Sequence, residues 1–206
     1  MRGRTNARRP VAGRTNARRP VAGRTNARRS DAPPAHAARS ATALNRIELL
    51  LLDVDGVLTD GRLYFSPRGE ALKTFHVRDG HGIKLLMNSG VRVAVASGRR
   101  SGAVASRMRE LGVRDVLQGC SDKVAALERL AQRHSIDPLA CACIVDDTPD
   151  LPLMTAVGFA AAVADAHPLV LSAAHWISSS PGGRGAVREL CDAILRARST
   201  QTLEPG

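Results

Sequence analysis

The sequence has few aromatic residues and no long apolar run. Only five of its 206 residues are Phe, Tyr or Trp, so the chain is poorly supplied for binding nucleic acid by stacking bases on aromatic rings. No stretch reaches the roughly 18 consecutive apolar residues of a membrane-spanning helix, and the basic N-terminus lacks the apolar core of a secretory signal. With only four cysteines as well, the composition predicts a cytoplasmic protein with free thiols and no membrane partner.

Acidic residues are nearly absent from one end of the chain. Residues 1–40 contain eleven arginines and a single acid, Asp31, which accounts for most of the formal net charge of +11. The segment Gly-Arg-Thr-Asn-Ala-Arg-Arg occurs three times, beginning at Gly3, Gly13 and Gly23. Like charges and low hydrophobicity predict a disordered basic arm over 1–43, followed by one folded domain over 44–198 and a flexible tail over 199–206.

Two interpretations of the arm stay open. It binds nucleic acid or acidic lipid through phosphate contacts, or it is a duplicated tail, or a start assigned too far upstream, with no selected role. The second interpretation is favoured because charged runs of this kind are often solvated segments without a function. Nucleic acid is therefore an expected partner only if the arm binds it.

From residue 44 onward, short apolar runs alternate with amphipathic segments. This alternation predicts right-handed crossovers and a mostly parallel sheet with helices on both faces, which is a Rossmann-like, doubly wound α/β fold. The first predicted strand is 47–52, and a β-hairpin with arms 62–65 and 70–77 follows it. Further strands are predicted at 91–96, 116–117, 141–145, 159–163 and 175–177, and helices at 80–89, 101–111, 122–134, 151–157, 167–173 and 185–197.

Residues capable of phosphoryl chemistry follow the predicted strands, at the edge where doubly wound sheets bind ligands. Asp53 and Asp55 come directly after the first strand, where one carboxylate can act as nucleophile and metal ligand while the other serves as acid or base. Ser97 and Gly98 follow the next strand and offer a hydroxyl and an amide to a phosphate. Lys123 adds a point charge suited to a phosphoryl oxygen.

A second group of carboxylates, Asp146, Asp147 and Asp150, follows the strand 141–145. Hard oxygen ligands of this kind suit Mg²⁺, which takes few protein carboxylates and keeps several waters. Each motif by itself has an ordinary explanation as a turn, a helix cap or a surface charge. Four successive strand ends that carry a nucleophile, a hydroxyl, a cation and metal ligands favour an enzyme over these separate explanations.

In order and content, the four motifs resemble those of the haloacid dehalogenase superfamily of phosphotransferases. A finer resemblance is to its capless branch, the 3-deoxy-D-manno-octulosonate 8-phosphate (KDO 8-phosphate) phosphatases. It covers about residues 46–197 and rests on two segments, Phe75-His-Val-Arg-Asp-Gly-His-Gly-Ile83 and Gly182-Gly-Arg-Gly-Ala-Val-Arg-Glu189. Val145 departs from the pattern, because the family usually has Gly before its paired aspartates.

The resemblance implies a Mg²⁺-dependent phosphatase that hydrolyses KDO 8-phosphate in lipopolysaccharide biosynthesis. By this resemblance, Asp53 attacks phosphorus and forms an aspartyl-phosphate, while Asp55 first protonates the leaving oxygen and then activates water. The implied metal ligands are Asp53, the backbone carbonyl of Asp55, and Asp146.

The remaining positions of the motifs receive supporting roles by the same resemblance. Ser97, Gly98 and Lys123 would bind the phosphate, with Lys123 also taking part in catalysis. Asp147 would orient waters on the metal, and Asp150 would orient Lys123.

The implied substrate carries a carboxylate as well as a phosphate, and Arg can bind a carboxylate bidentately. Arg78, Arg99 and Arg184 are therefore the candidate substrate-binding residues. Members of the family are tetramers whose neighbouring subunits complete each site, so we expect a homotetramer in which the hairpin lies against a neighbour. Gly182 and Gly183, with the C-terminal tail, are candidates for a lid.

Two other functions remain to be weighed against this one. The substrate could be a related keto-acid sugar phosphate with nine carbons, which the sequence does not distinguish. The domain could also be a non-catalytic oligomerisation module of the same fold. The presence of Asp53, Asp55, Lys123 and Asp146 argues against a module, which has no use for these groups.

Overall fold

The computed structural model describes residues 43–67 and 69–201, so nearly all of the arm predicted over 1–43, and residues 202–206, lie outside the described residues. The central strand β1 (Leu49–Leu52) consists of four leucines, all buried. A strand in the middle of a parallel sheet has helices over both faces, so it requires a continuous apolar run in place of an alternating one.

Six parallel strands form the sheet. Strand β1 pairs with β4 (Arg92–Ser97) on one side and with β6 (Cys141–Val145) on the other. The full order is β5-β4-β1-β6-β7-β8, and the outer strands are β5 (Asp115–Gln118), β7 (Phe159–Ala162) and β8 (Trp176–Ile177). The chain reverses its direction of winding between β1 and β6, which confirms the predicted doubly wound topology.

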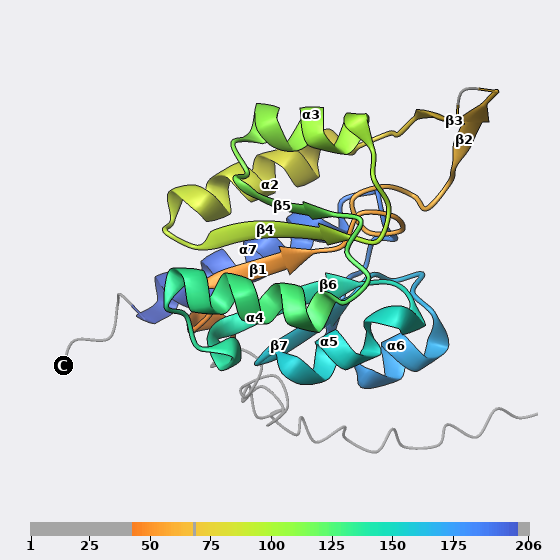
Figure 1. Ribbon diagram of the computed structural model, residues 1–206. Helices are drawn as coiled ribbons and strands as arrows, with labels where there is room; N and C mark the ends of the chain where they lie inside the picture. Colours follow the sequence, from red (N-terminus) through yellow and green to blue (C-terminus); the bar gives the residue numbers. More distant parts are fainter. Residues whose placement is uncertain (1–42, 68, 202–206) are drawn as a thin grey trace, which may run out of the picture. The chain divides into compact units, whose positions relative to one another are not determined.

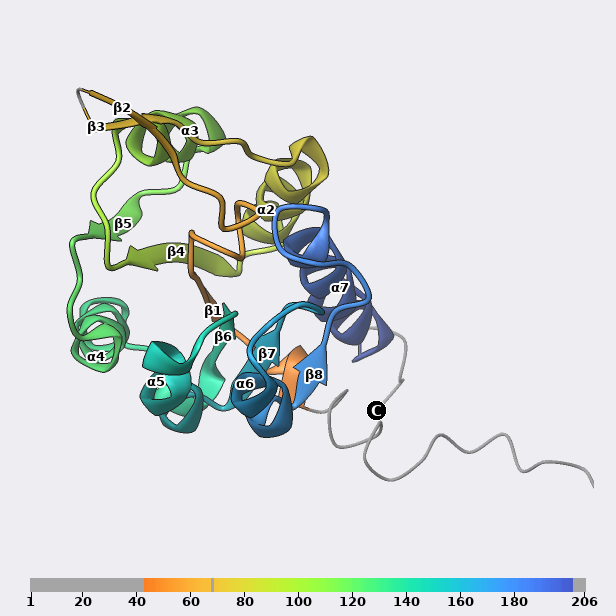
Figure 2. The ribbon, with the colours of Figure 1, turned by 90° about the vertical axis from the view of Figure 1, so that its right-hand side faces the viewer.

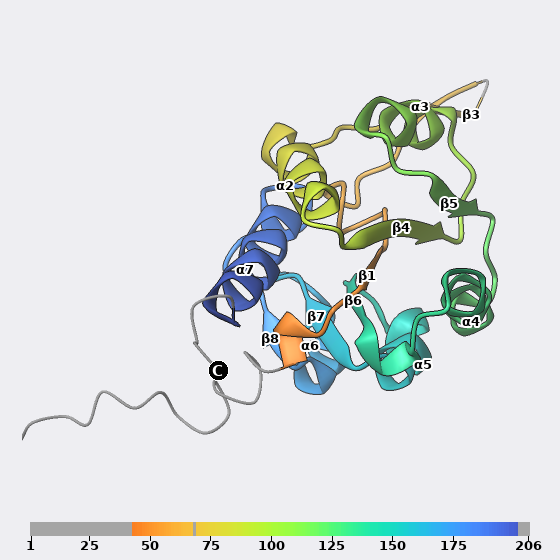
Figure 3. The same cartoon turned by 90° about the vertical axis from the view of Figure 1, so that its left-hand side faces the viewer.

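Helices cover both faces of the sheet, as Figures 1 and 2 show. Helices α2, α3 and α7 pack on one face and α4, α5 and α6 on the other, an arrangement that Figure 3 shows from the opposite side. Their bounds are α2 (Val77–Asn88), α3 (Gly102–Leu111), α4 (Lys123–His134), α5 (Leu151–Ala156), α6 (Pro168–Ala173) and α7 (Ala186–Gln201), with short 3-10 turns η1 (Pro138–Ala140) and η2 (Thr148–Asp150). None of the described helices combines the length and apolar content needed to cross a membrane.

A separate antiparallel hairpin, β2 (Tyr64–Ser66) and β3 (Gly69–Leu72), projects beyond the carboxyl ends of the main sheet (Figure 1). The described residues place only this hairpin and its flanking segments between β1 and α2. The predicted architecture, with a flap in place of a cap domain, is therefore confirmed.

Two predicted boundaries were wrong around the start of α2. The second arm of the hairpin ends at Leu72, and α2 begins at Val77 instead of Gly80. Gly80 and Gly82 lie inside the helix, at positions where Arg107 and Arg188 pack against it and leave no room for a Cβ. A Cβ on Gly82 would lie 2.8 Å from Cδ and 3.2 Å from Cα of Arg188, so this glycine allows α7 to approach α2 closely.

The carboxylate of Asp79 ties the same two helices together. Asp79 is buried in the first turn of α2, and its Oδ1 accepts a 2.8 Å hydrogen bond from the backbone N–H of Arg188 in the first turn of α7. It satisfies one of the backbone donors that a helix N-terminus leaves without an intrahelical partner. Helix α7 also continues to Gln201, beyond the predicted end at residue 197.

Replacing Gly82 with Ala is expected to lower the free energy of unfolding by about 1–2 kcal/mol, because the added Cβ overpacks the contact with Arg188. Gly102, in the first turn of α3, is the matched control, since a Cβ there meets nothing within 4 Å. Gly102→Ala is expected to be neutral or slightly stabilising. Urea unfolding of both variants tests this, and equal midpoints would contradict close packing of α2 and α7.

Candidate active site

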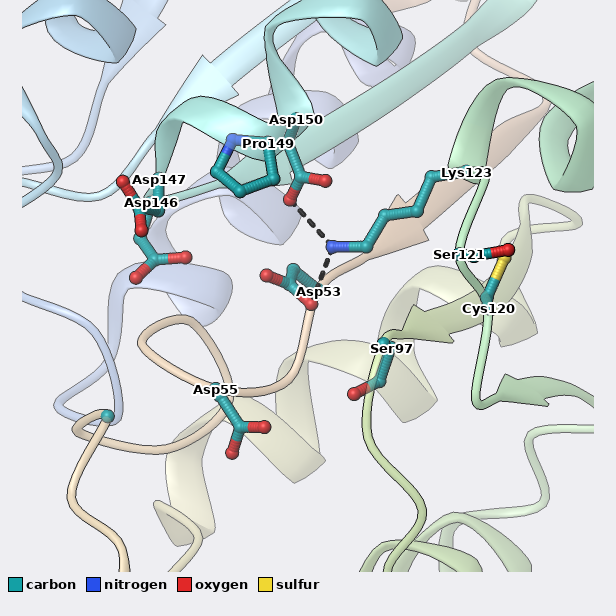
Figure 4. A pocket seen from close by; sticks show the side chains of 12 residues that line it. Asp53, Asp55, Ser97, Cys120, Ser121, Lys123, Asp146, Asp147, Pro149 and Asp150 are labelled. Carbon is teal, nitrogen blue, oxygen red and sulfur yellow. Dashed lines mark hydrogen bonds and ion pairs between the residues drawn. The ribbon is translucent and has the colours of Figure 1, made fainter.

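A cavity of about 370 Å³ opens at the carboxyl ends of β1, β4 and β6 (Figure 4). Every residue predicted from the strand-end motifs to act in catalysis, metal binding or phosphate binding contributes to its wall, and none of the three predicted substrate-binding arginines does. The lining residues are Asp53, Asp55, Gly61, Ser97, Gly98, Cys120, Ser121, Lys123, Asp146, Asp147, Pro149 and Asp150.

The loop after β1 is folded around the side chain of Thr59. This buried hydroxyl donates to the carbonyl of Val54 at 3.3 Å and accepts from the backbone N–H groups of Gly56 at 3.4 Å and Gly61 at 3.3 Å. Gly56 has a φ of +85°, a conformation that side chains with a Cβ rarely adopt. The tight loop presents both of its first two aspartates to the cavity.

Glycines also allow other segments to lie against this loop. A Cβ on Gly56 would overlap the carboxylate of Asp146, and one on Gly182 would overlap the carbonyl of Gly56. The backbone N–H of Gly183 donates to the carbonyl of Val57 at 2.8 Å. The Gly182–Gly183 segment therefore packs directly against this loop.

Lys123 links two of the carboxylates in the cavity. Its Nζ lies 2.9 Å from Oδ1 of Asp53 and 2.6 Å from Oδ2 of Asp150, as the dashed lines in Figure 4 show. Asp122 caps α4 by accepting from the N–H of Ala125 at 2.9 Å, so Lys123 is held at the first position of a fixed helix. Burial by itself would lower the pKa of Lys123, but the two carboxylates outweigh it and raise the pKa.

The carboxylates of the cavity repel one another. Burial is the largest cause of a pKa of about 6 for Asp53; the charge of Asp150 adds to it, and Lys123 opposes it. Burial likewise raises the pKa of Asp146 to about 7, with contributions from Asp53, Asp147 and Asp150. One lysine thus leaves much of this buried negative charge uncompensated, and the site has a strong tendency to bind a cation or protons.

The donors present fit Mg²⁺. Within residues 43–67 and 69–201, no three His, Cys, Asp or Glu side chains converge to hold a metal by themselves. Two carboxylates, Asp53 and Asp146, line the cavity directly after the neighbouring strands β1 and β6, and the loop after β1 lines it as well through Asp55 and Gly61. Mg²⁺ prefers this kind of site, with few carboxylates, oxygen donors only and room for waters.

Asp55 faces two cations, one directly after the hairpin and one in the loop after β4. The ammonium of Lys73 contacts its Oδ1, and Nε of Arg99 lies 3.7 Å from its Oδ2. Lys73 was not predicted from the sequence. The sequence did contain a signal, because lysine is rare in this chain, which has 27 arginines and only three lysines, at 73, 84 and 123. Two of these three lysines contact carboxylates of the cavity.

Comparison with known proteins agrees with this geometry. Residues 113–190 match the haloacid dehalogenase-like hydrolase family. A 3-deoxy-D-manno-octulosonate 8-phosphate phosphatase of Yersinia pestis is 48% identical over 152 residues, which is 74% of this chain and 81% of the relative. The chain belongs to the KDO 8-phosphate phosphatase family.

Solved structures of the family have the same fold. A crystal structure of the Yersinia pestis phosphatase superposes with a TM-score of 0.77 at 44% identity, covering 80% of this chain and 89% of that one. The phosphatase of Moraxella catarrhalis, solved in complex with magnesium ion, phosphate ion and KDO, has a TM-score of 0.75 at 37% identity over 78% of this chain and 92% of that one.

The three arginines suggested by the family resemblance lie in different surroundings. Arg99 is next to the cavity, where it contacts Asp55 and lies over the ring of Phe65, with Cζ 5.8 Å from the ring centroid. Arg78 is exposed in the first turn of α2, and Arg184 is exposed between Gly183 and α7. The last two do not line the cavity.

The departure from the family pattern at Val145 places no side chain in the cavity wall. Val145 is the last residue of β6, fully buried, and its carbonyl accepts from Val163 at 3.3 Å. Its side chain belongs to the hydrophobic core and not to the cavity wall.

The raised pKa of Asp146 gives a prediction for the metal-free protein. A carboxyl whose folded pKa is about 7, against an ordinary value of 3.8, favours the fold at low pH and loses this contribution as the pH rises towards 7. Asp146→Asn has no such loss. In EDTA its Tm is expected to exceed that of the wild type by about 2 °C or more at pH 8, and by less at pH 5. A Tm difference that does not depend on pH would contradict the crowding of carboxylates.

Proposed function

We propose that this chain is a Mg²⁺-dependent phosphatase that hydrolyses KDO 8-phosphate to KDO and inorganic phosphate, a step of lipopolysaccharide biosynthesis. The observation that carries the proposal is the cavity itself. It brings Asp53, Lys123 and Asp146 together at the carboxyl ends of the strands where the winding of the sheet reverses. A relative that is 48% identical to this chain is a phosphatase for this substrate. A non-catalytic module would have no reason to bury these charges together, because their repulsion lowers the stability of the fold.

Asp53 is the proposed nucleophile. Its Oδ1 is held by the N–H of Val54 at 2.7 Å and by Lys123, which leaves the other oxygen to attack phosphorus in line. The bond from phosphorus to the sugar oxygen breaks as the bond to Asp53 forms. Asp55, two residues on, gives a proton to the departing oxygen and then takes one from the water that hydrolyses the aspartyl-phosphate.

The phosphoryl oxygens are bound on the opposite wall of the cavity. Ser97 is buried at the end of β4, and Gly98 places backbone next to it. Lys123 supplies a positive charge, which Asp150 holds in place. Fixed donors that face the transferring group stabilise its charge without reorganising, which is the main contribution a protein makes to phosphoryl transfer.

The proposed ligands of Mg²⁺ are Asp53, the carbonyl of Asp55, and Asp146. The ion, when bound, supplies positive charge that offsets the repulsion between carboxylates and phosphate. Asp147 accepts from the N–H of Thr148 at 2.7 Å, which fixes its carboxylate at the rim of the cavity, where it would orient waters of the ion.

The carboxylate end of the substrate would extend from the cavity towards the hairpin. Arg99 is the proposed contact at the rim, since it is 43% exposed by side chain and already next to Asp55. Arg78 and Arg184 are proposed to bind more distant parts of the substrate. A nine-carbon keto-acid phosphate has the same two charged ends, so it is the closest competing substrate.

We infer a homotetramer in which the hairpin packs against a neighbouring subunit. Four large apolar side chains on or beside the hairpin are exposed, namely Leu63, Tyr64, Phe65 and Leu72. A contiguous exposed apolar surface is typical of a protein interface. The cavity has no cap domain over it, so a neighbouring subunit would also shield it from water.

The phosphatase domain is proposed to span residues 44–198, and the arm to contribute nothing to the reaction. All the residues lining the cavity lie between 53 and 150. A cytoplasmic location is proposed because Cys120, Cys141, Cys143 and Cys191 are all free, which suits a reducing compartment.

The substrate is tested by measuring phosphate release from KDO 8-phosphate with Mg²⁺ or EDTA, next to a panel of sugar phosphates that includes a nine-carbon keto-acid 9-phosphate. We expect metal-dependent turnover with a strong preference for KDO 8-phosphate, and less than about 1% of it in Asp53→Asn. Similar slow turnover of many esters would contradict the substrate. Substantial activity of Asp53→Asn would contradict the nucleophile.

The assembly is tested by light scattering and kinetics of Phe65→Asp/Leu72→Asp. The wild type is expected to be a tetramer, and the variant to dissociate with a loss of at least about tenfold in kcat/KM, because buried charges oppose association. Leu169→Asp is the control, since Leu169 is 59% exposed in α6, away from the hairpin, and should leave both properties unchanged. A fully active wild-type monomer would contradict the shared interface.

A further inference from the structure

The segment between the hairpin and α2 carries a buried lysine next to exposed apolar residues. The Lys73 side chain is 1% exposed, whereas Leu72, directly before it, is 53% exposed. Charged side chains are usually the exposed ones, and a buried ammonium is unfavourable unless a carboxylate pairs with it. Lys73 therefore points inward, where its ammonium contacts the carboxylate of Asp55.

Lys73 and Arg99 divide the Asp55 carboxylate between them. Lys73 contacts Oδ1 and Arg99 lies 3.7 Å from Oδ2, so one cation is placed at each oxygen. These two contacts restrict the rotation of the carboxylate, because rotation about either side-chain bond would lengthen one of them. Lys123 lies elsewhere, with Asp53 and Asp150 (Figure 4).

Both cations lie next to the hairpin. Lys73 directly follows its second strand, β3, and Arg99 lies against the ring of Phe65 in its first strand, β2. Asp55 is thus connected to the hairpin directly through Lys73 and indirectly through Arg99 and Phe65. Asp53, in contrast, is held by the backbone N–H of Val54 and by Lys123 of α4.

We propose that Lys73 is a positioning residue that holds Asp55 towards the leaving oxygen of the substrate. The proposal rests on the function proposed above and adds a residue to it. In the first half-reaction the bond between phosphorus and the leaving oxygen breaks, and the proton on Asp55 passes to that oxygen. Positioning matters only for a leaving group that needs this proton.

The leaving group provides a readout that a purely structural role would not affect. A sugar alkoxide is a poor leaving group and requires protonation, whereas p-nitrophenolate, whose conjugate acid has a pKa of about 7, departs without it. With enzyme in excess, Lys73→Met is expected to slow the release of KDO from KDO 8-phosphate by at least about tenfold. Release of p-nitrophenolate from p-nitrophenyl phosphate is expected to stay within about threefold of the wild-type rate.

Lys84→Met is the matched control, because Lys84 is an exposed lysine on the neighbouring helix α2. It is expected to leave both rates unchanged. An equal fall of both rates in Lys73→Met would overturn the proposal in favour of a general structural role, and unchanged rates would overturn it as well.

A second comparison remains informative even if Lys73→Met does not fold. The double variant Asp55→Asn/Lys73→Met removes both charges, so neither is left unpaired. If Lys73 acts through Asp55, its rate of sugar release should equal that of Asp55→Asn within about twofold. A further loss of tenfold would show that Lys73 acts independently of Asp55, and the proposal would be wrong.

Failure of the proposed substrate has a different outcome from failure of this inference. If the wild type hydrolyses another sugar phosphate in place of KDO 8-phosphate, only the substrate is wrong, and the same two leaving groups are compared with that ester. If it releases p-nitrophenolate but no sugar from any ester, both proposals are wrong.

Discussion

Mutual repulsion among buried carboxylates is the interaction on which this site depends. Asp53, Asp146 and Asp150 are brought to one edge of the sheet, where Lys123 compensates only part of their charge, and the pKa values of the first two rise to about 6 and about 7. Such an arrangement lowers stability in the absence of a cation. It is retained because a site with excess negative charge binds Mg²⁺, and the ion in turn admits an anionic phosphate.

The fold brings this charge together by steric means more than by attractive contacts. The winding reversal places the end of β1 next to the end of β6, and Gly56 leaves room for the Asp146 carboxylate against the loop. Gly182 and Gly183 then approach the same loop from behind. The Gly182–Gly183 segment, which is part of the resemblance to the family, can pack against this loop because its glycines have no side chains. This packing supports the conformation of a loop that carries several charges.

The hairpin lies next to the open side of the cavity, where other members of the superfamily would have a cap domain. Through Lys73, and through the contact of Phe65 with Arg99, it reaches the carboxylate of Asp55, while Tyr64 and Leu72 of the same hairpin are exposed. The same small element therefore combines a buried lysine at the Asp55 carboxylate with exposed apolar side chains.

The sequence alone determined the fold class and the group of residues at the strand ends, because period, chain order and the strand-end rule are local properties that need no knowledge of contacts. Asp53, Ser97, Lys123 and Asp146 were found in this way, and they line one cavity. Only the tertiary structure decided that α2 begins at Val77 and that Lys73 turns inward to Asp55. Both depend on contacts that local sequence patterns do not show. Gly82 lies inside a helix where Arg188, distant in sequence, packs against it. Lys73, next to Leu72, would be expected at the surface, and only the folded structure places it against the carboxylate of Asp55.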